Sequence, residues 1–443
     1  MGSKWESVRL GDYCIKIGSG ATPKGGNSVY TDTGNTYFIR SQNVYNDGFN
    51  TNGLVFITDE AAFKLKNVDV QESDVLLNIT GDSVARVCIV PRAFLPARVN
   101  QHVAIIRPKN DAFDPRFLRY FLSSPHQQAL LLTLASAGAT RNALTKGMIE
   151  DLQVPKPPVH TQISIANVLE SFDKKIESSN TINQTLEQMS QTLFKSWFVD
   201  FDPVIDNALD AGNPIPEALQ SRAELRQKIR NSVDFKPLPA DIRALFPAEF
   251  EEKELGCIPK SWMTNRLENI LELAYGKALK KTERTNGDYP VYGSGGVDGT
   301  HNEYLVKGPG IIVGRKGTVG SLHWENKNFY PIDTVFFVKP KEYYSLVYCY
   351  QLLKTLGLEN MNTDAAVPGL NRNNAYRLEV VTPTQSIITK FTNIIQTIQH
   401  KMDSNHNETE NLTALRDTLL PKLISGELSL EDLPDSIKQT EPA

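Results

Sequence analysis

Residues 159–198 read VHTQISIANVLESFDKKIESSNTINQTLEQMSQTLFKSWF, a run that contains neither glycine nor proline. The segment just before it, 155–158, holds three prolines, and prolines commonly stand where a new helix begins. A second run of this kind follows Pro383 and extends over 384–420. We therefore expect two long helices, each extending about 60 Å at the usual rise per residue.

Both runs carry apolar residues at every seventh position, which is the pattern of a coiled coil. The third layer of each row is polar, and a buried polar layer lowers stability but determines the register. The pattern favours a helix pair over two independent amphipathic surface helices, and an antiparallel pair suits two symmetric halves. The predicted helix-pairing residues are Ile165, Phe172, Ser179, Leu186 and Leu193 in the first helix, and Phe391, Ile398, Asn405, Leu412 and Leu419 in the second.

The two halves of the chain repeat each other. Trp5 matches Trp262 at an offset of 257 residues, and the nearby arginine and leucine match as well. Further on, Leu144 matches Leu370, and this offset of 226 residues persists through both long runs. A constant offset over two whole helices is not expected by chance. Each half is therefore interpreted as a globular segment followed by a long helix.

The globular segments combine short β-rich runs, bounded by Gly, Pro and Asn, with a few helical stretches. No strand–helix alternation at steady spacing occurs, so a doubly wound sheet is not expected. The predicted fold is α/β in the mixed α+β sense, with two pseudo-symmetric globular domains joined by two long antiparallel coiled-coil helices. The predicted segments are domain 1 at 1–156, helix 1 at 157–200, a linker at 201–261, domain 2 at 262–382, helix 2 at 383–424 and a flexible tail at 425–443.

The net charge of −4 reflects 47 Lys and Arg against 51 Asp and Glu, which argues against a uniformly basic nucleic-acid binder. The charge is unevenly distributed, however. The two globular segments carry +3 and +2, whereas the first helix with the linker carries −5 and the second helix with the tail carries −4. Positive charge therefore gathers where a nucleic-acid surface would be expected.

Four cysteines, Cys14, Cys88, Cys257 and Cys349, stand far apart without a C-x-x-C pair. Their spacing excludes a disulfide framework and a cysteine-rich zinc site, and it fits a reducing compartment. The N-terminus has no apolar signal segment, and no apolar run approaches the ~18 residues of a membrane span. A cytoplasmic protein is expected.

Catalytic signatures are missing from the sequence. The Gly-Lys pair at 276–277 lacks the upstream glycine of a phosphate-binding loop, and no H-E-x-x-H motif occurs. The Glu-Glu-Lys stretch at 251–253, with Asp241 upstream, could be interpreted as a nuclease element, but a solvated charge run in an acidic linker is favoured. We expect no catalytic residue, no metal and no cofactor in this chain.

Several clusters combine arginine with Asn, Gln, Ser or Thr, which are the residue types that hydrogen-bond base edges. Lys, Arg and the amides of glycine-rich turns hold phosphates. For any one residue an ordinary exposed polar role is the alternative, but two repeated domains favour DNA reading. The predicted DNA-binding residues are Arg40, Gln42, Asn43, Asn78, Thr80, Arg86, Arg98, Asn100, Gln101 and Arg141 in domain 1, and Lys277, Lys280, Lys281, Tyr292, Ser294, Arg315, Lys316, Thr318, Asn371 and Arg372 in domain 2.

Five stretches of the chain resemble the specificity (S) subunits of type I restriction-modification systems. The similarity spans essentially the whole chain. The stretches are LFKSWFVDFDP at 193–203, LFPAEFEE at 245–252, LGCIPKSW at 255–262, YPVYGSG at 289–295 and IIVGRKG at 311–317.

The resemblance implies two target-recognition domains, each reading one half of a split, asymmetric site in double-stranded DNA. It also implies that the helices form an antiparallel spacer and dock two adenine-N6 methyltransferase subunits, while motor/nuclease restriction subunits join for cleavage. AdoMet, ATP and Mg²⁺ would belong to those partners, with no membrane involved. Trp197 and Phe198, which end the first helix, are predicted to dock a partner.

Two other functions remain as alternatives. One is a repeat-built protein-interaction adaptor without DNA specificity, which steep salt dependence of DNA binding would exclude. The other is a self-contained nuclease–methyltransferase fragment, against which the missing motifs argue.

Overall fold

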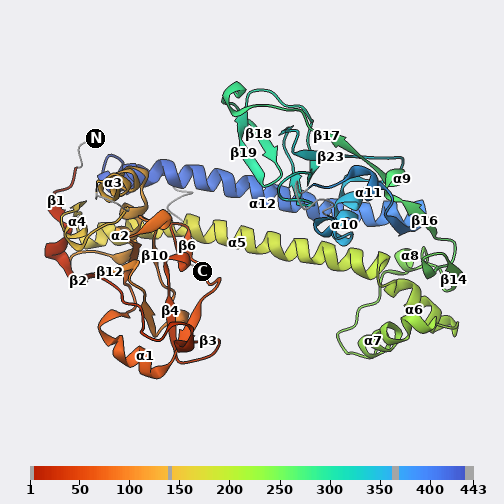
Figure 1. The fold of residues 1–443 in the computed structure, drawn as a ribbon, viewed down its shortest axis with the longest axis horizontal. Coiled ribbons are helices and arrows are strands. Elements are labelled where there is room, and N and C mark those ends of the chain that lie inside the picture. Colours follow the sequence, from red (N-terminus) through yellow and green to blue (C-terminus); the bar gives the residue numbers. More distant parts are fainter. Residues whose placement is uncertain (1–3, 138–141, 362–368, 435–443) are drawn as a thin grey trace. The chain divides into compact units, whose positions relative to one another are not determined.

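The structure is a computed structural model that describes residues 4–137, 142–361 and 369–434. The chain divides into two compact units. The first unit comprises residues 1–179 with 407–443, and the second unit comprises residues 180–406. Two long helices, α5 (Val159–Phe198) and α12 (Gln385–Ser425), each contribute one half to each unit (Figure 1). None of the described helices is long and apolar enough to span a membrane.

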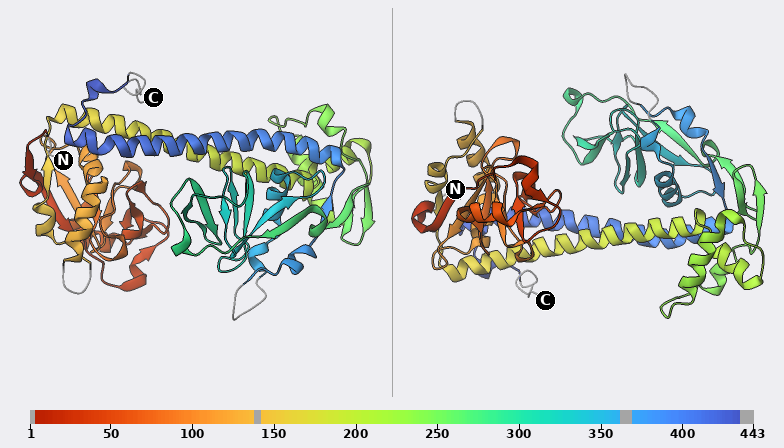
Figure 2. Two further views of the ribbon diagram at one scale, coloured as in Figure 1. Left: turned by 90° about the horizontal axis from the view of Figure 1, so that it is seen from above. Right: turned by 60° about the horizontal axis from the view of Figure 1, so that its bottom comes forward.

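The helices α5 and α12 lie side by side and antiparallel within each unit (Figure 2). In the second unit, Phe194 contacts Phe391 with 5.6 Å between ring centroids, and Asn183 is bonded to Asn405. The contacts therefore run in opposite directions along the two helices. In the first unit, the start of α5 and the end of α12 share one apolar core. The predicted mixed α+β fold with paired long helices is confirmed.

A buried polar layer is present in the helix pair of the second unit. Asn405 is 2% exposed, and its Nδ2 donates a hydrogen bond to Asn183 Oδ1 at 2.8 Å. Asn183 Nδ2 in turn donates to the Met402 carbonyl at 3.0 Å. The predicted counterpart, Ser179, lies one turn earlier in α5. The hydrogen-bond partner of Asn405 is therefore Asn183, which lies outside the predicted heptad row.

The other predicted pairing positions differ in their burial. Ile165, Phe172, Phe391 and Leu419 are buried in the cores of their units. The remaining ones are half-buried, namely Ser179, Leu186, Leu193, Ile398 and Leu412.

The globular part of the first unit contains a four-stranded sheet of order β10-β9-β12-β2 and a five-stranded sheet of order β3-β7-β4-β11-β8. Two-stranded pairs are β1-β13 and β5-β6. The strands are β1 Ser7–Arg9, β2 Cys14–Ser19, β3 Tyr30–Thr31, β4 Thr36–Ile39, β5 Val44–Tyr45, β6 Gly48–Phe49, β7 Val55–Ile57, β8 Asp69–Val70, β9 Val75–Asn78, β10 Val87–Ile89, β11 Ala97–Val99, β12 Val103–Pro108 and β13 Gln153–Pro155. The helices are α1 Asp59–Lys64, α2 Pro115–Ser123, α3 Pro125–Ser136 and α4 Lys146–Glu150.

The central strands of the four-stranded sheet are apolar on both faces. In β9, Val75 and Leu77 point into the core shared with the long helices, while Leu76 points into a second core beneath the five-stranded sheet. Side chains alternate between the faces of a strand, so a strand covered on both sides needs a continuous apolar run.

The globular part of the second unit repeats this arrangement. Its four-stranded sheet has the order β17-β23-β20-β21, and it is joined by the three-stranded sheet β19-β18-β22 and the pair β16-β24. The strands are β16 Met263–Arg266, β17 Leu271–Tyr275, β18 Tyr289–Gly293, β19 Gly296–His301, β20 Gly310–Gly314, β21 Leu322–Glu325, β22 Tyr330–Pro331, β23 Val335–Pro340 and β24 Glu379–Thr382. The helices are α9 Leu267–Ile270, α10 Leu346–Thr355 and α11 Arg372–Tyr376.

Residues 201–261, predicted as a linker, are folded. Asp202, Asp206 and Asp210 lie along one side of α6, and each accepts a hydrogen bond from the arginine twenty positions later in α7. These charge pairs hold the two helices together. The elements are α6 Asp202–Ala211, α7 Gln220–Arg230, α8 Ala240–Arg243, β14 Phe250–Lys253 and β15 Gly256–Pro259.

The first part of the predicted flexible tail is docked against the first unit, so the prediction of flexibility is wrong there. Leu433 is 4% exposed, and Leu428 and Leu430 pack against the core of the first unit. Three leucines within six positions supply the apolar area that docks this segment. Residues 435–443 of the predicted tail lie outside the described residues.

Candidate nucleic-acid interface

Both units build the same backbone arrangement at the end of the strand that comes first along the chain in the four-stranded sheet. This strand is β2 in the first unit and β17 in the second. Gly20 N donates to the Val103 carbonyl at 2.9 Å, and Gly276 N donates to the Val335 carbonyl at 3.2 Å. A Cβ at either glycine would lie 2.1 Å from a carbonyl oxygen of the neighbouring segment. Only glycine allows this close approach, so the two turns are equivalent.

The segments that follow β9 and β20 continue the equivalence. Leu144 N donates to the Ile79 carbonyl in the first unit, and Leu370 N donates to the Arg315 carbonyl in the second, both at 2.8 Å. Isolated bridges pair Thr80 with residue 143 and Lys316 with residue 369. We call these surroundings the framework edge, which comprises residues 19–22, 79–80, 101–102 and 143–146 in the first unit and 275–278, 315–316, 333–334 and 369–372 in the second.

The framework edge of the second unit is cationic and aromatic. Tyr275 is 48% exposed. The guanidinium carbons of Arg315 and Arg372 lie 5.0 Å and 4.8 Å from the centroid of its ring. Lys277 and Lys316 are exposed on the same edge. These side chains offer hydrogen-bond donors to the acceptors of a nucleic acid.

The framework edge of the first unit is mainly polar, with one lysine, Lys146, which lies 3.4 Å from Glu150. Thr80 Oγ1 lies 2.6 Å from His102 Nδ1, and Gln101 Nε2 lies 3.3 Å from His102 Nε2. Thr22 is hydrogen-bonded to the Gln101 side chain. Such groups can donate to and accept from base edges. Tyr275, His102 and Thr22 lie on these edges and were not among the predicted residues; the glycine that ends the first strand, Gly20 or Gly276, is a sequence signal that points to these edges.

The predicted DNA-binding residues fall into groups of different exposure. Arg141 lies outside the described residues. Half-buried are Arg40, Thr80, Arg86, Arg98, Ser294, Arg315 and Arg372. Exposed are Gln42, Gln101, Lys277, Lys280, Lys281, Lys316, Thr318 and Asn371.

Four predicted DNA-binding residues are buried and hold the protein together instead. Asn43 Nδ2 donates to the Asn50 carbonyl, Asn78 Nδ2 donates to the Ser41 carbonyl, and Asn100 Oδ1 accepts from His102 N. The Tyr292 hydroxyl donates to Glu325 Oε2 at 2.9 Å. A base edge cannot reach side chains that are at most 7% exposed, so the prediction is wrong for Asn43, Asn78, Asn100 and Tyr292.

Other predicted residues already have partners within the chain. Arg98 donates through Nε to the Ala62 carbonyl at 3.2 Å and through Nη1 to the Ala97 carbonyl at 2.9 Å. The guanidinium of Arg86 lies 4.4 Å from the ring centroid of Tyr45. Further pairs join Arg40 to Gly53, Lys280 to Glu283 and Lys281 to Asp298.

Trp197 and Phe198 do not present a docking surface. They are 1% and 5% exposed and lie in the core of the second unit. The Trp197 ring contacts Phe246 and Phe391, with centroid distances of 5.0 Å and 5.8 Å. The predicted partner docking by these two residues is therefore wrong, because the segment after α5 folds back over them.

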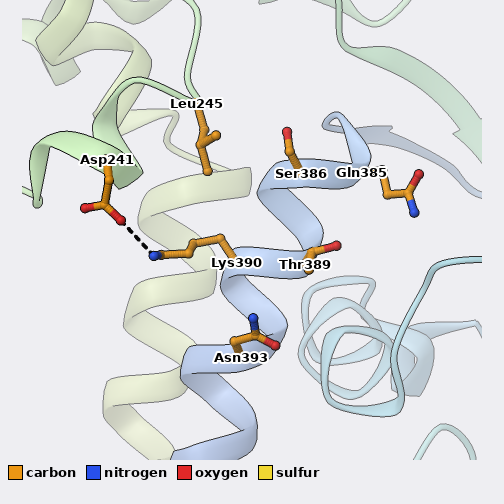
Figure 3. A pocket seen from close by; sticks show the side chains of 7 residues that line it. All are labelled: Asp241, Leu245, Gln385, Ser386, Thr389, Lys390 and Asn393. Atoms are coloured by element: carbon orange, nitrogen blue, oxygen red, sulfur yellow. Dashed lines mark hydrogen bonds and ion pairs between the residues drawn. The ribbon is translucent and has the colours of Figure 1, made fainter.

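The nuclease interpretation of the linker finds no support in the geometry. Asp241 lines a shallow pocket of about 570 Å³, where the Lys390 ammonium is 2.8 Å from its carboxylate (Figure 3). The hydrogen bond from Lys390 lowers the pKa of Asp241. Glu251 accepts instead from Ser261 N, at 2.9 Å. Each carboxylate is thus held by its own partner, and no group of three metal-binding side chains occurs in the described residues.

Comparison with known proteins gives consistent matches. A family model described as the type I restriction modification DNA specificity domain matches residues 2–188 and 259–413. The HindI specificity subunit of Haemophilus influenzae is 26% identical over 470 residues, covering 96% of this chain and 100% of the relative. The MjaIX specificity subunit of Methanocaldococcus jannaschii is 25% identical, covering 76% and 74%. The crystal structure of an S subunit from M. genitalium has a TM-score of 0.56 at 19% identity, covering 95% and 96%.

Proposed function

The chain belongs to the type I restriction-modification DNA specificity family, and we propose that each of its two units reads one half of a split, asymmetric DNA site. The family match establishes DNA sequence recognition as the function. The division into half-sites, the contacting residues and the partner surfaces are the proposal.

One observation carries the division into half-sites. The two framework edges share glycine turns and backbone hydrogen bonds, but they display different side chains. The first offers Gln, His and Thr with a single lysine, whereas the second offers a tyrosine, two arginines and two lysines. Equal backbones with unequal side chains would present two base sequences with different hydrogen-bonding partners, which is what an asymmetric site requires.

We expect Gln101→Ala to change recognition in one half of the site only. Gln101 is exposed on the first framework edge, and a lost base contact costs about 1–3 kcal/mol of discrimination at that position. The measurement is methylome sequencing of cells that carry the complete system, which reads the modified adenines in context. Gln153→Ala, an exposed glutamine on β13, is the matched control. Equal relaxation of both halves would contradict the model of one unit per half-site.

Salt dependence separates this proposal from the adaptor alternative. Phosphate contacts release counterions, so the affinity of specific DNA binding falls steeply as salt rises. An adaptor without DNA specificity would show no preference for the modified sequence at any salt concentration.

We further infer that the chain recognises DNA while partner subunits carry out the chemistry. In this arrangement adenine-N6 methyltransferase subunits bind AdoMet, and restriction subunits use ATP and Mg²⁺. The support is the family membership together with a sequence that lacks catalytic motifs.

Exposed apolar residues of α5 are the proposed docking surface for a methyltransferase subunit. Ile182 is 43% exposed and Met189 is 53% exposed. The two are seven positions apart and therefore lie on the same side of the helix. They replace Trp197 and Phe198 as candidates, because only exposed side chains can contact a partner.

We expect the double variant Ile182→Asp with Met189→Asp to lose co-purification of the methyltransferase subunit. Burying two carboxylates in an apolar interface costs several kcal/mol, enough to weaken binding by more than about 100-fold. Gln188→Asp adds a charge to an exposed position on a different side of α5 and serves as the control. Retained co-purification of the double variant would exclude this surface.

A further inference from the structure

Tyr275 brings two arginines together on the framework edge of the second unit. It ends β17, and its ring packs against the buried Phe336 with 5.0 Å between centroids. Both guanidiniums, from Arg315 and Arg372, lie within about 5 Å of the ring centroid, as cation–π pairs do. Arg315 Nη1 also donates to the Asp333 carbonyl at 3.0 Å. The ring thus holds two positive charges from separate segments.

These two charges are not neutralised within the described part of the chain. Neither guanidinium has a carboxylate within ion-pair distance there, and Arg372 Nε is buried without a hydrogen-bond acceptor. Bringing like charges together and burying a donor both cost free energy. The ring face offsets only part of this cost. The arrangement therefore favours a ligand that carries acceptors.

The first unit shows that the fold does not need this cluster. At the equivalent positions of the same framework stand Ser19, before Gly20, and Ile79, whose carbonyl accepts from Leu144 N. The third position is Lys146, which follows the helix-capping Thr145 as Arg372 follows the capping Asn371. A framework that folds with Ser, Ile and Lys has no structural requirement for Tyr, Arg and Arg.

We propose that Arg315 and Arg372, positioned by Tyr275, form a paired-guanidinium site that binds hydrogen-bond acceptors of the DNA half-site read by the second unit. The inference rests on the proposed division into half-sites and names its specificity residues. The acceptors are either the O6 and N7 edge of a guanine or phosphate oxygens, since both take paired N–H donors. Tyr275 is the positioning residue, because it orders two flexible side chains before DNA arrives.

The test exchanges the cluster for its counterparts from the first unit. Tyr275→Ser, Arg315→Ile and Arg372→Lys are made singly in the full chain, assembled with its partner subunits, alongside Tyr275→Phe. Affinity is measured for the DNA site that methylome sequencing identifies and for duplexes with each base pair of either half replaced. Thermal unfolding of each variant checks that the fold is retained, as the first unit predicts.

We expect Arg315→Ile to weaken binding of the intact site by about 10- to 100-fold. Tyr275→Ser is expected to weaken it by about 3- to 30-fold, with Tyr275→Phe restoring wild-type affinity because phenylalanine keeps the ring face. If the acceptor is a guanine, Arg315→Ile loses discrimination at one base pair of the half-site read by the second unit. If it is a phosphate, binding weakens equally for all sequences and the salt slope falls by about 1 per lost contact.

Two results would overturn the proposal. One is unchanged affinity and discrimination in folded Tyr275→Ser and Arg315→Ile. The other is loss of discrimination in the half-site assigned to the first unit. Failure of the underlying half-site model looks different, because the wild-type complex itself would then show no separable halves.

Discussion

Trp197→Ala is expected to destabilise the second unit by about 3–5 kcal/mol. The indole is 1% exposed and contacts Phe246, Phe391 and Phe198, so its removal leaves a cavity where three aromatic rings meet. Native-state hydrogen exchange of the full chain measures this, since it reports opening free energies segment by segment. Protection is expected to fall in α10 and the paired part of α12, and to persist in β9 and β12 of the first unit.

Val199→Ala is the matched control, because Val199 lies two positions away and is 45% exposed. It is expected to change stability by less than about 0.5 kcal/mol. A Trp197→Ala chain that kept full protection and lost only partner binding would return this residue to a docking role.

Asp173→Ala is expected to destabilise the first unit by about 3–5 kcal/mol. Its carboxylate accepts from Arg119 Nη1 at 2.9 Å, from the Tyr120 hydroxyl at 2.7 Å and from Arg416 Nη1 at 2.7 Å. Removing it leaves Arg119, which is 9% exposed, as a buried charge without its carboxylate. The same contact joins α5 to the last part of α12, so the helix pair of the first unit loosens as well.

The same carboxylate makes the first unit sensitive to acid. Burial by itself raises the pKa of Asp173, but Arg119, Tyr120 and Arg416 outweigh burial and hold the pKa below its ordinary value. A depressed folded-state pKa contributes stability that is fully present above the unfolded value of about 3.9 and is lost as the pH falls through the folded value. Stability curves of wild type and Asp173→Ala are therefore expected to converge below about pH 4.

Asp417→Asn is the control for this pair of measurements, because Asp417 is bonded to Arg416 but its side chain is 54% exposed. An exposed pair of this kind contributes at most about 1 kcal/mol. Parallel pH curves for wild type and Asp173→Ala would show that the network does not contribute through the Asp173 charge.

The residues predicted to read DNA show how much of the candidate site local sequence can identify. Composition selected Arg315 and Gln101, which lie on the framework edges and stay predictions. It selected Asn78 and Asn100 equally, although both bond to the backbone of their own unit. Tyr275 was missed because an aromatic residue at the end of a strand is ordinary there. Its position between two arginines depends on segments 40 and 97 residues away in the chain.

The long helices also show what the sequence pattern predicts and what only the packed structure decides. The glycine-free runs, the heptads and the constant offset of 226 residues are local or periodic features, and they established two long helices and two repeated halves. Helix formation depends on neighbours within one or two turns, so such patterns can be read without the fold. The partner of Asn405 was a different matter, since its hydrogen bond goes to Asn183, which lies outside the predicted heptad row.

By itself, the sequence determined the mixed α+β class, the duplication, the helix pair and the family to which the chain belongs. Tertiary structure alone decided that 201–261 is folded, that Trp197 is core, and that Tyr275, Arg315 and Arg372 share one edge. The physical reason is the range of the interactions. Periodicity and turn residues act between near neighbours, whereas burial and the pairing of charges arise only when distant strands and helices have packed.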